Sequence, residues 1–404
     1  MIPKEFESVT KDDIDSLVAN LTPEGRDLEY KELLPGKSSK DVHEFLADVS
    51  SFANASGGDL LYGIREKRDS AGQPTGMPET AQGLPGINAD AEKLRLEQML
   101  LSGIDPRIPG IRLKHLEGFP ARSIVIVIRV PKSWAAPHMV KLDYSSRFFS
   151  RTSAGKYQLD VREIRAQFLL SESLGDRIGS FRSDRLGKIM ANETPVPLEP
   201  GPRLVLHLLP VASFAEQPAL DLRSAQQHGS KLVPMGRPQT YGPLSFNFNG
   251  LFSSGGNESQ KPFSYLQLFR NGAFEAVYAR TAMNRLIYGI DWEQQVIRMG
   301  PSYMQFQKQI GLRPPLFIAI SILSARSFIV VPSEPNGPHG LMNLRPIEED
   351  ALLAPEVLLE DQEADVQRLL RPAFDTFWQA SGWPGSPGYD ANGSWVGHKS
   401  LLQS

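Results

Sequence analysis

The sequence contains no cysteine among its 404 residues. This absence excludes disulfides, thiolate metal sites and cysteine nucleophiles, and it fits a reducing compartment. Long apolar runs are also missing, since residues 123–130 and 316–323 are too short to span a bilayer. The first twenty residues are polar and acidic, unlike a signal peptide. We therefore expect a soluble cytoplasmic protein with no membrane association.

The chain also lacks a strong net charge, with 43 basic and 46 acidic residues. This balance excludes a uniformly basic nucleic-acid binder, but it leaves local patches open. Between Arg122 and Lys156 seven basic residues and a single acid, Asp143, are interleaved with aromatic residues. Cations neutralise phosphates, and exposed aromatic rings stack on unpaired bases. The candidate contacts to nucleic acid are Lys132, His138, Lys141, Arg147, Arg151 and Lys156.

An ordinary interpretation of the same segment stays open. The segment would then be strand-rich, with its aromatic residues in the core and its charges in solvent. For His138, between two predicted strands, a structural hydrogen bond is the alternative to a phosphate contact.

Hydrophobic periodicity predicts a mixed first half. Three- and four-residue spacing predicts helices over residues 11–20, 39–54, 90–102 and 160–171. Strands are predicted at 27–33, 59–64, 112–117, 123–130 and 147–152, with an exposed loop over 68–86. Gly57-Gly58 is a helix stop that supplies the positive φ such an end needs.

Composition changes at residues 191–202, where four prolines and a glycine predict a linker. Beyond it strands are predicted at 204–209, 244–251, 265–269, 273–278 and 327–331, with Asn271-Gly272 as a hairpin turn. Helices are predicted at or near 281–288 and over 364–378. The expected fold is α+β: a mixed α/β domain over 1–190, a β-rich α+β domain over 203–380 of unassigned role, and a flexible tail over 381–404.

Three carboxylates in the first seventy residues are the clearest sign of chemistry. Glu24 and Glu29 stand five residues apart, Lys31 follows, and Glu66 comes after the next predicted strand. Glu29 and Lys31 should share one face of their strand, because side chains alternate along it. Carboxylates that converge suit hard divalent ions such as Mg²⁺. The alternative is that the three glutamates are surface acids paired with Arg26, Lys31 and Arg65.

These motifs together resemble the AlbA_2 domain of Schlafen-type proteins. The resemblance rests on Leu28-Glu29-Tyr30-Lys31, on Ala53-Asn54-Ala55-Ser56-Gly57-Gly58, and on Leu60-Leu61-Tyr62-Gly63-Ile64 with the acid that follows. Phe148 to Ser153 and the helix after it resemble the end of that domain. The resemblance covers roughly residues 20 to 170.

The resemblance implies a nuclease that cuts tRNA or other structured RNA with Mg²⁺ or Mn²⁺. Its two glutamates fall on Glu24 and Glu29, and its aspartate falls on Glu66, which is one methylene longer. Its lysine falls on Lys31, which would contact the scissile phosphate. It further implies a homodimer or larger assembly and a role in anti-phage defence with a phage-derived trigger. The rival interpretation is a regulator or sensor that binds nucleic acid without cutting it.

Overall fold

The computed structural model describes residues 1–143, 145–215, 220–236, 238–257, 261–279, 285–332, 344–360 and 364–397. The chain divides into two compact units, residues 1–173 and 174–404. Each is α+β, as the sequence predicts. Within the described part, every helix is too short or too polar to cross a membrane.

The first unit is built around a four-stranded sheet in the order β1-β2-β7-β6. Its strands are β1 (Leu28–Lys31), β2 (Gly57–Tyr62), β6 (Arg112–Phe119) and β7 (Ser123–Pro131). β1 and β2 are parallel and the other pairs antiparallel. β2 and most of β7 are buried on both faces, because they are the central strands. These four strands confirm the sequence predictions.

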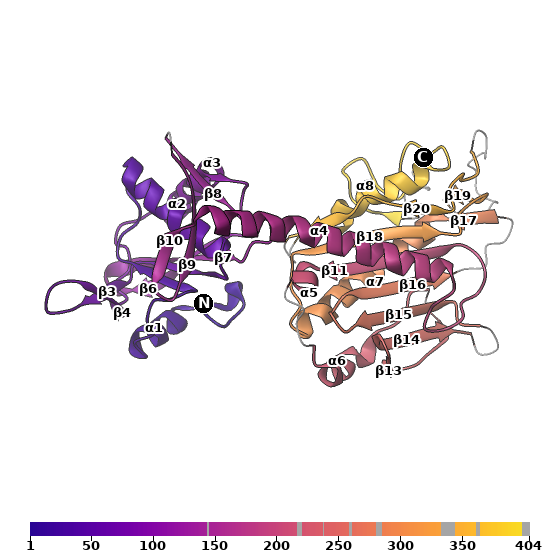
Figure 1. Ribbon diagram of the computed structural model, residues 1–404, viewed down its shortest axis with the longest axis horizontal. Coiled ribbons are helices and arrows are strands. Elements are labelled where there is room, and N and C mark those ends of the chain that lie inside the picture. Colours follow the sequence, from indigo (N-terminus) through magenta and orange to yellow (C-terminus); the bar gives the residue numbers. More distant parts are fainter. Residues whose placement is uncertain are drawn as a thin grey trace. The chain divides into compact units, whose positions relative to one another are not determined.

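A second, antiparallel sheet packs with the helices of this unit (Figure 1). Its order is β10-β9-β8-β5, formed by Gly155–Gln158, Ser145–Thr152, Met139–Leu142 and Ile104–Asp105. The helices are α1 (Lys11–Ala19), α2 (Ser39–Ala53) and α3 (Ala89–Gly103). α2 begins where Ser38 accepts a hydrogen bond from the Asp41 backbone, and its apolar side fills the core between the two sheets.

The predicted loop over 68–86 is wrong in part. β3 (Arg65–Arg68) and β4 (Pro74–Thr80) pair there as an irregular two-stranded hairpin that extends from the body of the unit (Figure 1). Alternating hydrophobicity is absent from this segment, because nearly all its side chains are exposed. Strands are predicted from a hydrophobic alternation that arises from burial, so this exposed hairpin could not be predicted in that way.

Helix α4 (Val161–Met190) is much longer than the predicted 160–171. The division between the units falls within it, between Ser173 and Leu174, whereas the sequence placed a linker at 191–202. The sequence of its second half looks polar, because Arg182 and Arg185 occupy positions that are buried in the second unit.

The second unit contains a nine-stranded antiparallel sheet. Its path is β12-β14-β15-β16-β11-β18-β20, with β13 beside β14 and β21 beside β18. The strands are β11 (Arg203–Pro210), β12 (Thr240–Tyr241), β13 (Ser245–Asn247), β14 (Gly250–Gly256), β15 (Ser264–Phe269), β16 (Phe274–Ala279), β18 (Leu316–Leu323), β20 (Ala351–Leu353) and β21 (Val357–Leu359). The Asn271-Gly272 hairpin is confirmed, with Gly272 at φ 91° between β15 and β16. The predicted strand 244–251 is instead two strands, β13 and β14, joined by a turn.

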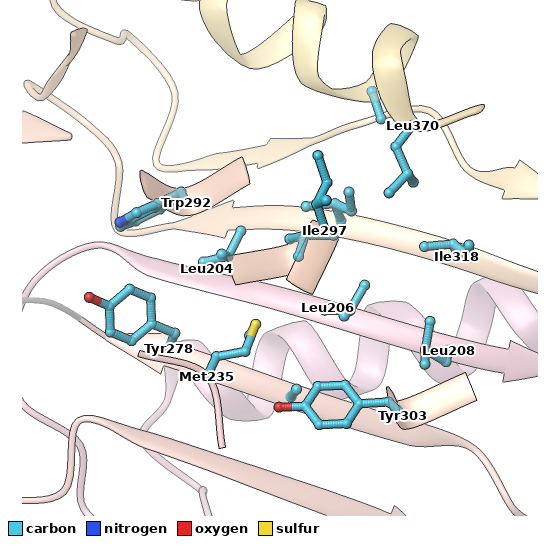
Figure 2. Packing of buried hydrophobic residues seen from close by; sticks show 14 of the residues in the cluster. Leu204, Leu206, Leu208, Met235, Tyr278, Trp292, Ile297, Tyr303, Ile318 and Leu370 are labelled. Atoms are coloured by element: carbon cyan, nitrogen blue, oxygen red, sulfur yellow. The ribbon is translucent and has the colours of Figure 1, made fainter. Parts of the chain in front are cut away.

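Helices cover both faces of this sheet. α7 (Gly289–Gln309) and α8 (Val366–Gln379) pack on the face that carries Leu204, Leu206 and Leu208 of β11 (Figure 2). The second half of α4 packs on the opposite face, against residues such as Val205 and Tyr265. Two short helices, α5 (Val211–Ala215) and α6 (Leu222–His228), and a parallel pair, β17 (Leu286–Tyr288) with β19 (Ile329–Val331), complete the unit.

Two further predictions need correction. The helix expected at or near 281–288 begins at Gly289; residues 286–288 are a strand, and 281–284 lie outside the described residues. The segment from Ser381 to Gly397 is packed, because Trp383 donates to Val330 O at 3.0 Å and Trp395 to Glu293 at 2.8 Å. The remainder of the predicted flexible tail, 398–404, lies outside the described residues.

Candidate active site

Strand β1 sends alternate side chains to two different environments. Leu28 and Tyr30 are buried in the core, while Glu29 and Lys31 project from the other face. Lys31 Nζ lies 2.7 Å from Glu29 Oε1, so the two side chains share a face as the sequence predicts. β1 is the edge strand of its sheet, so other parts of the chain can pack beside this pair.

Glu24 folds back over the start of β1. Its Oε1 accepts a hydrogen bond from the Tyr30 backbone at 2.7 Å, and its own N–H donates to Gly76 O at 2.7 Å. Gly76 belongs to β4, so this bond joins the hairpin to the chain before β1. Glu66 lies on β3 of the same hairpin. The sequence predicts it at the end of β2 instead. Its carboxyl group is hydrogen-bonded to that of Glu24.

The three glutamates line one hollow of about 380 Å³. The other residues that line it are Tyr30, Lys31, Glu32, Arg68, Pro74 and Gly76. β1 and the segment before it form one side, and the β3–β4 hairpin forms the other. The volume is that of an ordinary ligand pocket, and its lining is largely charged.

The surroundings shift the pKa values of Glu24 and Glu29 in opposite directions. Burial raises the pKa of Glu24, and the charge of Glu29 and the hydrogen bond with Glu66 add to that effect, to a value of about 8. Burial also acts to raise the pKa of Glu29, but the charges of Lys31 and Arg151 outweigh it and lower the pKa. At neutral pH Glu29 is therefore ionised, and Glu24 holds its proton.

Glu29 is held from behind by residues that the sequence did not connect with it. Arg151 of β9 donates a hydrogen bond to Glu29 Oε2, and its guanidinium stacks on the Phe52 ring at 4.0 Å. Asp48 of α2 lies 3.7 Å from Lys31 Nζ and 2.8 Å from Lys156 Nζ. Burial works to lower the pKa of Lys31, but Asp48 and Glu29 outweigh it and raise the pKa. These contacts fix Glu29 and Lys31 in place.

The Asn-x-x-Gly-Gly motif has a structural role beside this network. Asn54 Nδ2 donates to His138 O at 2.9 Å and Phe149 O at 2.8 Å, and Asn54 Oδ1 accepts from His138 N at 2.7 Å. A Cβ at Gly57 would meet backbone atoms at 2.7 Å, and one at Gly58 would meet the Phe52 ring at 2.2 Å. The motif thus joins α2, β2 and the second sheet closely enough for Arg151 to reach Glu29.

The six predicted nucleic-acid contacts do not form one surface. Lys141 and Arg147 are exposed on the paired strands β8 and β9, and Lys132 lies with its Nζ 4.1 Å from the Trp134 ring centroid. Lys156 is engaged by Asp48 and by Glu44, at 2.8 and 2.6 Å. Tyr144, one of the interleaved aromatic residues, lies outside the described residues.

Two of the six contacts need correction, because their side chains are buried. Arg151 is bound to Glu29 with its side chain 1% exposed. His138 is fully buried, and its Nδ1 lies 2.7 Å from Pro106 O, so the structural alternative for this residue is the one that the geometry favours. Spacing along the chain cannot distinguish an exposed basic residue from one that neutralises a buried acid.

The carboxylates suit a hard metal ion in type but are not gathered around one point. Among the described residues, no three His, Cys, Asp or Glu side chains are close enough to hold an ion as they stand. Oxygens of Glu24 and Glu29 are engaged by Tyr30 N, Lys31 and Arg151. The proton held by Glu24 is the feature that fits a cation, because a divalent ion can replace the proton of a carboxyl group that lies beside other carboxylates.

Sequence reasoning missed two residues of this site. Asp48 is on the buried side of α2, where a carboxylate is rare unless it is paired, and that rarity was the available signal. Arg68 lies in the segment predicted to be a loop, and no pattern in the sequence places it in the hollow.

Comparison with known proteins supports the family resemblance. Residues 24–160 match the family model described as "Schlafen, AlbA_2". The solved N-terminal domain of a RecG-related protein from Nitrosomonas europaea is 21% identical, covering 31% of this chain and 74% of that one, with a TM-score of 0.22. That TM-score is too low to support an argument from shared fold. No curated protein matches the chain.

Proposed function

Because this chain carries a Schlafen AlbA_2 domain over residues 24–160, we propose that it is a divalent-metal-dependent endoribonuclease that cuts tRNA or another structured RNA. The observation that carries the proposal is the hollow that Glu24, Glu29 and Glu66 line together. Such a set of acids has little structural purpose, since mutual repulsion and burial push one of them, Glu24, to a pKa of about 8.

The residues of the chain have distinct tasks in this proposal. Glu24, Glu66 and Glu29 would hold Mg²⁺ or Mn²⁺ through their carboxylate oxygens, with Glu24 giving up its proton and Glu29 already ionised. The ion would supply an activated water and neutralise charge on the phosphate. Lys31 and Arg151 keep Glu29 oriented. In the reaction water adds to phosphorus, the P–O bond to one sugar breaks, and the proton lost by the water is balanced by one gained by the leaving oxygen.

The decisive test is cleavage of total tRNA in Mn²⁺, Mg²⁺ or EDTA. Glu29→Gln keeps the shape of the side chain but removes its charge, and should abolish metal-dependent fragments. Glu97→Gln, at an exposed glutamate of α3, is the matched control and should cut like the wild type. Intact RNA in every metal, from protein that is folded by circular dichroism, would contradict the proposal.

One observation favours the rival function, a binding protein without catalysis. Glu29 already has two cationic partners, so the site is neutralised in part without a metal. A regulator of this kind should shift tRNA in a gel equally with EDTA or Mn²⁺, and Glu29→Gln should leave that shift unchanged.

We also propose that the active form is a homodimer or larger assembly, with defence against phage as its setting and a phage-derived trigger that raises a basal cleavage activity. The family model matches a single segment of the chain, so a second copy would supply a second domain for a large RNA. Light scattering after gel filtration tests the assembly: a monomer at micromolar concentration would contradict it.

A further inference from the structure

The hollow contains two cations, and they differ in how far they are already neutralised. Lys31 lies between two carboxylates, 2.7 Å from Glu29 Oε1 and 3.7 Å from Asp48 Oδ2. Its positive charge compensates these two carboxylates, of which Asp48 is buried and Glu29 nearly so. Lys31 is thus poorly placed to give up these partners for a substrate phosphate.

The charge of Arg68, by contrast, is not neutralised by a carboxylate among the described residues. It is exposed on β3, it lines the hollow, and its Nη1 donates to Gly72 O at 2.8 Å, in the turn of its own hairpin. Among the residues that the structure describes, no carboxylate forms an ion pair with Arg68, whereas Arg65 on the same strand is paired with Glu79 at 2.8 Å. The guanidinium therefore keeps donors and charge for a ligand.

The position of Arg68 relative to the acids fits a phosphate contact. It stands two residues from Glu66 on β3, and both line the hollow from the hairpin side, opposite Glu29 and Lys31 of β1. A phosphodiester held among the acids would bring its negative charge close to several carboxylates, so a cationic side chain beside it would lower the repulsion that remains after a metal ion binds. Arginine is suited to this task, since its planar fork binds two phosphate oxygens at once.

We propose that Arg68 is a substrate-binding residue that holds a phosphate of the RNA backbone at the open side of the hollow, with the β3–β4 hairpin as the element that presents it. This inference rests on the proposed nuclease function and reassigns the phosphate contact from Lys31 to Arg68. The hairpin carries both Glu66 and Arg68, so it joins an acid of the site to the substrate contact.

The test compares Arg68→Ala, Arg68→Lys and Lys67→Ala. Lys67 is an exposed neighbour on the same strand that does not line the hollow, so its loss removes the same charge without the same contact. Binding of a labelled tRNA transcript is measured in EDTA over a range of salt, and cleavage is measured in Mn²⁺. Thermal melting should be unchanged in all three variants, because both side chains are exposed.

The expected result is a loss of affinity of about tenfold in Arg68→Ala, with a salt dependence reduced by roughly one phosphate contact. Arg68→Lys should keep the salt dependence but recover only part of the affinity. Lys67→Ala should change affinity less than threefold. Equal effects of Arg68→Ala and Lys67→Ala on a protein that cuts tRNA would overturn the role of Arg68 and leave the nuclease intact.

The remaining outcomes separate the two proposals. Binding that depends on Arg68, in a protein that cuts nothing in Mn²⁺, would support the phosphate contact and contradict the nuclease. A folded wild type that neither binds nor cuts tRNA would contradict both.

Discussion

Asn54 binds the backbone of His138 at both of its polar groups. Its Oδ1 accepts from His138 N at 2.7 Å, and its Nδ2 donates to His138 O at 2.9 Å. The same nitrogen also donates to Phe149 O at 2.8 Å. One side chain thus joins the end of α2 to the segment before β8 and to β9 itself. The Asn-x-x-Gly-Gly motif, on which the family resemblance partly rests, thus has a packing role.

Asn54→Ala should destabilise the first unit by about 2–4 kcal/mol, because three buried backbone groups lose their partner. Urea denaturation followed by far-UV circular dichroism measures this loss. Asn20→Ala is the control, since Asn20 is an exposed residue after α1, and its effect should stay within about 0.5 kcal/mol. Equal effects of the two substitutions would show that the Asn54 bonds contribute little.

Arg151 and Arg147 lie on the same strand but should affect different kinetic parameters. Arg151 is buried against Glu29, so Arg151→Lys should lower kcat by about 10- to 100-fold, the usual effect of disturbing a residue that orients a metal ligand. Arg147 is exposed, so Arg147→Ala should raise KM for tRNA and leave kcat unchanged. Steady-state cleavage at two salt concentrations distinguishes them. A rise in KM alone for Arg151→Lys would return Arg151 to the surface contacts predicted from the sequence.

Metal should reverse the order of stability between the wild type and Glu24→Gln. Without metal the variant should be at least as stable as the wild type above pH 7, because it removes one of the acids that repel one another in the hollow. With Mn²⁺ at about 100 times its Kd, the wild type should gain roughly 2.7 kcal/mol and the variant much less.

Thermal melting in EDTA and in Mn²⁺ gives this comparison without any cleavage assay. Glu97→Gln serves as the control, and its metal-induced gain should equal that of the wild type. A gain from Mn²⁺ that is the same in Glu24→Gln would exclude Glu24 from the proposed metal site.

The sequence predicted the elements that have a strong apolar pattern. Helix α2 was expected over 39–54 and spans Ser39–Ala53, and the central strand β7 was found because Val and Ile fill most of it. The β3–β4 hairpin was missed for the opposite reason, as its side chains are exposed and it has no buried face. The second half of α4 was missed because arginines occupy two of its six buried positions and interrupt the apolar pattern.

For the site, sequence order and a family resemblance were enough to choose Glu24, Glu29, Lys31 and Glu66, which line one hollow. Their roles stay predictions. The supporting residues could not be found in this way, because Asp48 and Arg151 come from α2 and β9 and meet Glu29 and Lys31 only through the tertiary fold. A basic residue that neutralises a buried acid has the same sequence signature as one that binds phosphate.

The second unit contains a buried carboxylate that makes its stability depend on pH. Glu275 accepts hydrogen bonds from Arg185 at 2.9 and 3.0 Å, from Tyr265 at 2.8 Å, and lies 2.9 Å from His207 Nε2. Burial acts to raise its pKa, but the bonds from His207 and Arg185 outweigh it and lower the pKa to about 2. α4 is held to the sheet through this carboxylate.

A carboxyl group whose pKa is lower in the folded state stabilises the fold above its ordinary pKa near 4.5, and this stabilisation is lost as pH falls toward 2. Glu275→Gln should therefore cost about 3–5 kcal/mol at pH 7, since it leaves Arg185 buried without its partner charge. The difference from the wild type should narrow between pH 4.5 and 2.5, because the carboxyl group takes up a proton over this range in the unfolded chain and stays ionised in the folded one.

Urea denaturation followed by tryptophan fluorescence suits this test, because four of the five tryptophans belong to the second unit: Trp292, Trp378, Trp383 and Trp395. Asp184→Asn is the matched control, one residue from Arg185 on α4, where Asp184 forms an exposed pair with Lys188. Its effect should stay below about 0.5 kcal/mol at every pH. If Glu275→Gln kept a constant difference from the wild type down to pH 2.5, the pH dependence would have to arise from other groups, and the ion pair would contribute through packing alone.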